Sequence, residues 1–118
     1  MPRILVCGDR KWTDEWAIRR ELWRRMESEP TIIHGAARGA DSIAGEIAGR
    51  LGLAVLAFPA QWEKYGKAAG PIRNKQMLDE GKPNLVLAFH KNLAASKGTA
   101  DMVRQARKRG IPVEVFTE

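Results

Sequence analysis

Five short apolar runs alternate along this chain with segments that have helical periodicity. The runs occupy residues 3–7, 31–34, 53–58, 85–89 and 113–116. Short, nearly continuous runs of this kind are typical of strands buried on both faces of a parallel sheet. Because a helical segment lies between successive runs, the pattern predicts an α/β fold. The expected architecture is one five-stranded parallel sheet with helices on both faces and right-handed crossovers.

The segments between the runs carry helix signals. The predicted helices cover, in chain order, residues 14–29, 43–51, 71–80 and 99–109. Thr13 or Asp14 is placed to cap the first helix, and residues 60–69 give no clear assignment. Trp16 and Trp23 share the apolar stripe predicted for the first helix, so we expect them either in the core or at an interface.

Length and composition limit the class of protein. A chain of 118 residues is long enough for one core and short for two, so we expect a single domain over residues 1–118. With 44% hydrophobic and 29% charged residues, the composition excludes disordered, collagen-like and coiled-coil classes. No apolar run approaches the roughly 20 residues of a membrane span, and one cysteine, Cys7, cannot form an internal disulfide. We therefore predict a cytoplasmic protein, and the net charge of +6 favours anionic partners.

Glycine and charged residues follow the predicted strands, where parallel sheets bind ligands. They are Gly8, Asp9, Arg10 and Trp12 after the first strand, His34, Gly35, Arg38, Gly39 and Asp41 after the second, Trp62 after the third, and His90, Ser96, Lys97, Gly98 and Thr99 after the fourth. Glycine lets backbone N–H groups approach a ligand, and the start of the next helix favours an anion. The pattern indicates a phosphate-bearing ligand, although such turns also occur where a strand simply bends into a helix.

Several single residues have two interpretations. Arg73 and Asn74 fall in the first turn of the predicted helix that begins at Gly70-Pro71. A basic residue there opposes the helix dipole, which favours an anion held by Arg73 over a merely solvated helix start. Trp62 either stacks on a base or covers the sheet edge. We expect Asp41 to cap the second helix.

Common fingerprints are missing from the sequence. Neither G-x-G-x-x-G nor G-x-x-x-x-G-K-[ST] occurs. His34 and His90 have no third ligand at metal spacing, so we predict neither a metal site nor a bound cofactor. Cys7 ends a buried strand, and we interpret it as a core residue.

Four ordered motifs resemble a known group. They read G-x-R-x-W-T-D, H-G-x-A-R-G-A-D, F-P-A-x-W-x-x-Y-G-x-A-A-G-P-I-R-N-x-x-M-L and G-T-A-D-M, and the resemblance covers about residues 4–115. Together they resemble the YspA-like branch of the SLOG superfamily, which includes Lonely Guy phosphoribohydrolases and the DNA-processing protein DprA. The resemblance implies a Rossmann-like three-layer domain with sheet order 3-2-1-4-5. It also implies a nucleotide or nucleotide-derived ligand at the strand exits and a homo-oligomer.

The resemblance places ligand-binding positions residue by residue. By motif they are Gly8, Arg10, Gly35, Arg38, Gly39, Asp41, Arg73, Asn74, Gly98 and Thr99. One departure concerns catalysis, because the position of the glutamate of Lonely Guy enzymes reads Met102. Asp101 lies one residue earlier, which is about 100° away around a helix. The other departure is Ser96, preceded by two alanines, where those enzymes have P-G-G.

Three functions remain open at this point. The first is binding of a nucleotide or nucleotide-derived ligand by the motif positions together with Trp12, Ser96 and Lys97. The second is N-glycosidic hydrolysis of a nucleotide, for which Asp41 and Asp101 are the candidate catalytic carboxylates and Asp9 is a further acid at the same edge. The third is nucleic-acid binding, which we expect to be weak and electrostatic because no recognition motif is present.

Overall fold

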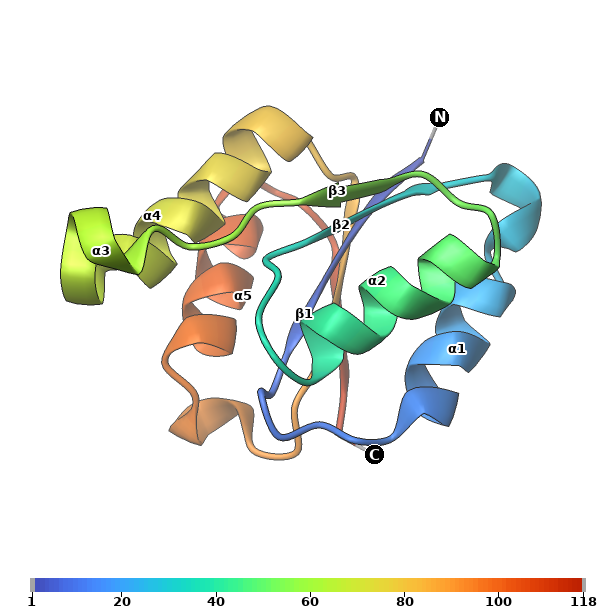
Figure 1. Cartoon of the computed structure of the whole chain (residues 1–118), viewed down its shortest axis with the longest axis horizontal. Coiled ribbons are helices and arrows are strands. Elements are labelled where there is room, and N and C mark those ends of the chain that lie inside the picture. Colours follow the sequence, from blue (N-terminus) through green and yellow to red (C-terminus); the bar gives the residue numbers. More distant parts are fainter. Residues whose placement is uncertain (1, 118) are drawn as a thin grey trace.

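The computed structural model describes residues 2–117 as a three-layer α/β domain (Figure 1). The helices and strands are, in chain order, β1 (Arg3–Gly8), α1 (Glu15–Trp23), β2 (Thr31–His34), α2 (Ala40–Arg50), β3 (Val55–Ala57), α3 (Trp62–Tyr65), α4 (Ala69–Gln76), β4 (Leu85–Phe89), α5 (Gly98–Lys108) and β5 (Val113–Phe116). Short 3-10 turns follow α1 and α3 and precede α5, and a π-helical turn, Met77–Gly81, extends α4. The predicted fold class is confirmed.

The five strands form one parallel sheet in the order β3-β2-β1-β4-β5, as the resemblance implied. From β1 the chain builds outward to β2 and β3, and then returns to add β4 on the other side of β1. Strand order therefore reverses between β1 and β4, where Gly8 is in register with Phe89. A reversal of this kind leaves a crevice at the carboxyl ends of the two strands.

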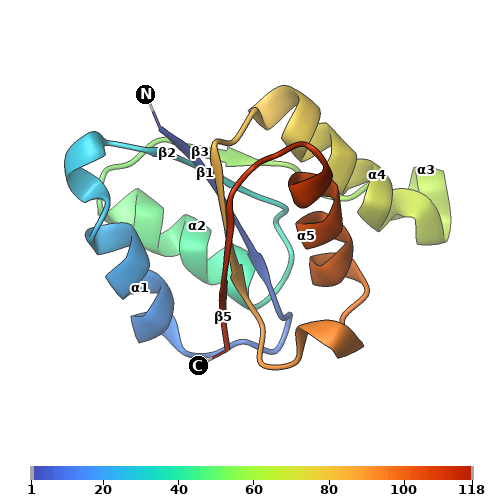
Figure 2. The same cartoon turned by 180° about the vertical axis from the view of Figure 1, so that it is seen from behind.

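Side chains of the central strands alternate between two apolar cores. Ile4 and Val6 of β1 pack with α1 and α2, whereas Leu5 and Cys7 pack with α5 and with the π-helical turn that extends α4. Figures 1 and 2 show these two helix pairs on opposite faces of the sheet. Cys7 is 6% exposed and belongs to the second core, in line with its interpretation as a core residue. The edge strand β3 is less enclosed, and its Leu56 is 38% exposed.

The first helix differs from its predicted stripe. Asp14 caps it, because the carboxylate Oδ1 accepts a hydrogen bond from the Ala17 N–H at 3.2 Å. The buried face carries Ala17, Ile18, Glu21 and Leu22, whereas Trp16 and Trp23 are 68% and 60% exposed. Of the two places predicted for these tryptophans, the core is therefore excluded, because they lie on the helix face opposite the buried residues, and the interface stays a prediction.

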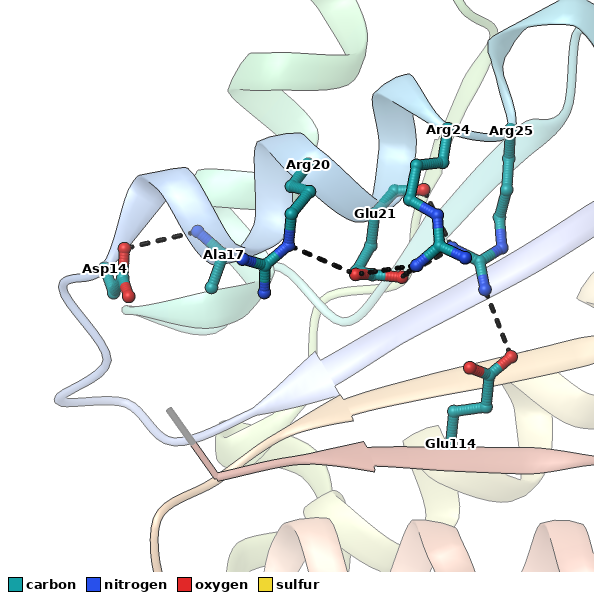
Figure 3. Close-up of polar contacts among 7 residues, drawn as sticks. All are labelled: Asp14, Ala17, Arg20, Glu21, Arg24, Arg25 and Glu114. Carbon is teal, nitrogen blue, oxygen red and sulfur yellow. Dashed lines mark hydrogen bonds and ion pairs between the residues drawn. The ribbon is translucent and has the colours of Figure 1, made fainter.

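Glu21 takes the place on the buried face that an apolar residue would otherwise fill (Figure 3). Its carboxylate is 2.9 Å from Arg25 Nη1, 3.3 Å from Arg24 Nη1 and 3.5 Å from Arg20 Nε. Arg25 also reaches Glu114 of β5 at 3.1 Å. Burial alone would raise the pKa of Glu21, but the hydrogen bond from Arg25 and the nearby arginine charges lower it overall. The network ties α1 to the edge of the sheet.

The stretch that gave no assignment is helical. α3, a 3-10 turn (Gly66–Ala68), α4 and the π-helical turn follow one another without a break between residues 62 and 81. The predicted helix start at Gly70-Pro71 is therefore too late, and Arg73 lies in the second turn of α4. The argument from the helix dipole does not apply there, because the dipole acts mainly on the first and last turns. Between residues 2 and 117, no helix has the length and apolar character required to cross a membrane.

Candidate functional site

A cavity of about 670 Å³ opens at the reversal of strand order, beyond the carboxyl ends of β1 and β4. Its walls come from the loop after β1, the start of α2, the helices α3 and α4, and the start of α5. The lining residues are Cys7, Gly8, Asp9, Arg10, Ala37, Asp41, Trp62, Lys67, Gly70, Pro71, Arg73, Asn74, Met77, His90, Ser96, Lys97, Gly98, Thr99 and Met102. The volume falls within the range of small-molecule sites in proteins.

The structure gathers most of the predicted positions at this cavity. Those that line it are Gly8, Arg10, Asp41, Arg73, Asn74, Ser96, Lys97, Gly98 and Thr99. Four others lie elsewhere: Trp12, Gly35, Arg38 and Gly39 are outside the lining found for residues 2–117. Trp12 is 4% exposed, packs edge-to-face on Phe89 at 5.6 Å, and donates from Nε1 to the Asp14 carbonyl. It is a core residue, and Arg38 is exposed to solvent.

The loop between β2 and α2 is folded around Asp41. The carboxylate Oδ2 accepts hydrogen bonds from the Gly35 N–H at 2.9 Å and the Ala37 N–H at 3.5 Å. α2 begins at Ala40 after Gly39, whose φ of +71° is one that L side chains rarely adopt. The prediction that Asp41 caps α2 was wrong, because its carboxylate closes the preceding loop instead.

Burial controls the titration of Asp41. It raises the pKa of this carboxyl to about 6, although Arg73, the two backbone N–H groups and Arg10 act to lower it. Burial also raises the pKa of the neighbouring Cys7 thiol, so Cys7 is not an activated nucleophile.

Arg73 is held in place across the sheet edge. Its Nη1 donates to the Gly35 carbonyl at 2.5 Å and its Nε to Asn74 Oδ1 at 3.2 Å. A Cβ on Gly35 would lie 2.7 Å from Arg73 Cζ and 2.9 Å from Asp41 Oδ2, so only glycine leaves room for the guanidinium. Burial lowers the pKa of Arg73, and the Asp41 carboxylate opposes that shift. The guanidinium remains a cation at neutral pH.

Asn74 connects Arg73 to the start of α5. Its side chain is 3% exposed, and Nδ2 donates to the Gly98 carbonyl at 3.2 Å and to Asp101 Oδ2 at 2.9 Å. Ser96 Oγ accepts from the Thr99 N–H at 3.0 Å, which pairs one N–H group in the first turn of this eleven-residue helix. The guanidinium of Arg73 and the N-terminus of α5 are thereby fixed around one cavity.

The YAcAr family model, described as the YspA, cpYpsA-related SLOG family, matches residues 2–65. The chain belongs to this family. The Gene 61 protein of Mycobacterium phage D29 is 38% identical over 126 residues, which cover 98% of this chain and 97% of that protein. This SLOG chain also superposes on DNA processing protein A (DprA) from Streptococcus pneumoniae, with a TM-score of 0.75 and 19% identity. The superposition covers 98% of this chain and half of the DprA chain, and at 19% identity the match establishes the fold alone.

The carboxylates of the SLOG chain are arranged unevenly around the cavity. Asp101 lies outside the lining of the described chain, and its oxygens accept from Asn74, from Gln105 Nε2 at 2.8 Å and from Arg104 Nη2 at 3.1 Å. Met102, fully buried, takes the lining position instead. Asp101 therefore joins α4 to α5, and the carboxylates that face the cavity are Asp9 and Asp41.

Sequence reasoning about this SLOG chain missed Lys67 altogether. It lies in the 3-10 turn between α3 and α4, within the segment that gave no assignment, and it lines the cavity. His90, which was noted among the residues that follow the fourth strand, has its Nε2 3.9 Å from Asp9 Oδ2 at the cavity wall. Lys67 could have been predicted at the cavity only if residues 60–69 had first been predicted as helical. Within residues 2–117, no three His, Cys, Asp or Glu side chains are grouped so as to hold a metal ion.

Proposed function

We propose that the cavity binds a nucleotide or nucleotide-derived phosphate ligand. The observation that carries this proposal is the link from Gly35 through Arg73 and Asn74 to Gly98. These hydrogen bonds hold the half-buried Arg73 guanidinium and the N-terminus of α5 at the same cavity. Both groups favour a phosphate, the first through charge-assisted hydrogen bonds and the second through its unpaired N–H groups and dipole.

The charges that line the cavity support an anionic ligand. Arg10, Lys67, Arg73 and Lys97 are cationic, against the carboxylates of Asp9 and Asp41. The cavity also lies at the reversal of strand order, where parallel α/β sheets bind their ligands. We also propose that the protein is located in the cytoplasm, where free nucleotides occur.

Calorimetry with Arg73→Ala tests this function. We expect a panel of nucleoside phosphates to include a ligand, and expect Arg73→Ala to weaken its binding by about 1.5–3 kcal/mol, the range for a hydrogen bond to a charged group. Arg38→Ala is the matched control, because Arg38 is an exposed arginine outside the cavity lining. Failure of every phosphate compound to bind, or equal losses in the two variants, would overturn the proposal.

N-glycosidic hydrolysis of a nucleotide is the second candidate. The observation that favours it is Asp41, a buried carboxyl at the cavity whose pKa is raised to about 6, a value suited to proton transfer near neutral pH. Against it, Oδ2 of Asp41 already accepts two backbone hydrogen bonds, and Met102 replaces the glutamate implied by the resemblance. Binding therefore remains the leading proposal.

We also propose that a second copy of this chain binds the outward face of α1. Trp16 and Trp23 are exposed there, seven residues apart and so on one side of the helix. Glu15 lies at the start of this helix and Arg24 at its end. In an antiparallel pair of α1 helices, the acidic start of one copy meets the basic end of the other.

Nucleic-acid binding is a weaker proposal. It rests on the net charge of +6, and the affinity should fall steeply as the salt concentration rises.

A further inference from the structure

Trp62 is an aromatic side chain that lies outside the two apolar cores found for residues 2–117. It opens α3 and is 49% exposed. Among the described residues it joins neither of the two apolar cores, so the alternative that it covers the sheet edge has no support. It does line the cavity at the strand exits. Figure 1 shows α3 beyond the sheet, next to the start of α4.

The ring of Trp62 lies against α4 at Gly70, a residue without a side chain. A Cβ added to Gly70 would lie 3.7 Å from Trp62 Cη2, in ordinary van der Waals contact. Gly70 and Arg73 both line the cavity and are three residues apart on α4. That spacing is about one helical turn, or roughly 4.5 Å along the axis. The indole and the guanidinium therefore belong to neighbouring parts of one site.

A planar group already occupies one face of this ring. The Arg10 guanidinium lies over Trp62, with Cζ 5.6 Å from the ring centroid. Arg10 comes from the loop after β1, so the pair spans the cavity between that loop and α3. The contact is a cation–π interaction, which at an exposed site contributes less binding energy than a stacked base does.

We propose that Trp62 is the stacking platform for the base of the ligand, so that the site takes a base-bearing nucleoside phosphate rather than a sugar phosphate. This inference rests on the proposed phosphate site and adds the class of ligand to it. Every base has a π-face, so stacking alone tolerates different bases. Purines present a larger face than pyrimidines, so we expect purine nucleotides to bind more tightly.

Two probes separate the base from the phosphate: adenosine 5′-monophosphate and ribose 5-phosphate, both measured by calorimetry. We expect Trp62→Ala to weaken binding of adenosine monophosphate about 5- to 150-fold, the range for loss of one stacked base. Binding of ribose 5-phosphate should change less than about two-fold, because its phosphate contacts are untouched. Trp62→Phe should restore most of the affinity for the nucleotide.

Tyr65→Ala is the matched control, because Tyr65 is an exposed aromatic residue of the same helix and lies outside the cavity lining found for residues 2–117. It should leave both affinities unchanged. If both probes bind and Trp62→Ala affects neither or both equally, the platform is overturned while the phosphate site stands. If neither probe nor any other nucleoside phosphate binds, the proposed function itself fails. Half-exposed Trp62 should be removable without unfolding the chain, and a far-UV circular dichroism spectrum checks this.

Discussion

The Arg73 guanidinium donates a hydrogen bond to the carbonyl of Gly35, a residue 38 positions earlier in the chain. The contact joins α4, on one face of the sheet, to the loop that leads into α2 on the other face. Asp41 closes the same loop through the Gly35 N–H. Both backbone groups of one glycine therefore set the position of the two ionisable side chains at the base of the cavity.

Gly35→Ala should disturb both the fold and the site. The new methyl group would overlap Arg73 and Asp41, and overpacking of this kind costs about 1–3 kcal/mol of unfolding free energy. Urea denaturation measures the loss. Gly49→Ala in α2 is the control, because nothing lies within 4 Å of its added Cβ and alanine favours a helix. Equal stability of Gly35→Ala and the parent chain would contradict this account.

Asp41 should make stability depend on pH. Its pKa is raised from 3.8 to about 6, so the folded chain holds this proton more tightly than the unfolded chain. The resulting stabilisation is complete below pH 3.8 and is lost as the pH rises through about 6. The amide side chain of Asp41→Asn carries no charge, so the variant should not lose this stability. As the pH rises from 3.8 to about 6, the unfolding free energy of the variant should therefore increase by about 3 kcal/mol relative to that of the parent chain. Urea unfolding at several pH values measures the difference, and a difference that stays constant with pH would refute the prediction.

We expect no release of free base from nucleoside monophosphates. The thioether of Met102 neither accepts a proton nor stabilises a developing positive charge as a carboxylate does. A chromatographic assay for free base, run on protein shown by calorimetry to bind the same nucleotide, tests this. Turnover that is present in the parent chain and disappears in Asp41→Asn would make the hydrolase the leading function. Turnover that disappears in Asp101→Asn would show that Asp101 does more than join α4 to α5.

Glu21→Gln should destabilise the fold although it lies far from the cavity lining. The change removes the charge that Arg20, Arg24 and Arg25 share on the buried face of α1. Because those arginines reach solvent to different degrees, we expect a loss of about 1–3 kcal/mol, below the range for a fully buried pair. Glu46→Gln breaks the exposed pair with Arg50 and should cost less than about 1 kcal/mol. Similar losses in the two variants would show that burial of Glu21 does not matter.

Self-association should depend on the exposed tryptophans of α1. The double variant Trp16→Ser/Trp23→Ser should sediment as a monomer at concentrations where the parent chain forms dimers. Sedimentation velocity measures this, with Trp62→Ala as a control that alters an exposed tryptophan of α3. A parent chain that stays monomeric at high concentration would contradict the proposed self-association through α1.

The local pattern of the sequence was enough to predict the sheet and most of the helices. Strands such as Leu85–Phe89 are short, apolar and buried on both faces, so the apolar run in the sequence is enough to identify them as strands. The cap of α1 could be predicted as Thr13 or Asp14, because capping involves residues only three positions apart, and the structure shows Asp14 in this role. Glycine turns at strand exits pointed to the edge of the sheet where the cavity opens, since parallel strands bring their carboxyl ends together.

Tertiary contacts decided the rest. Trp12 and Arg10 are two residues apart in one loop, yet the first packs into the core on Phe89 and the second lines the cavity. Arg73 is placed by Gly35 and Asn74 by Asp101, contacts that span 38 and 27 positions. A motif states which residue occupies each position, but the direction of a side chain depends on which distant backbone and side-chain atoms fill the space around it. That packing exists only once the sheet has brought its strand ends together.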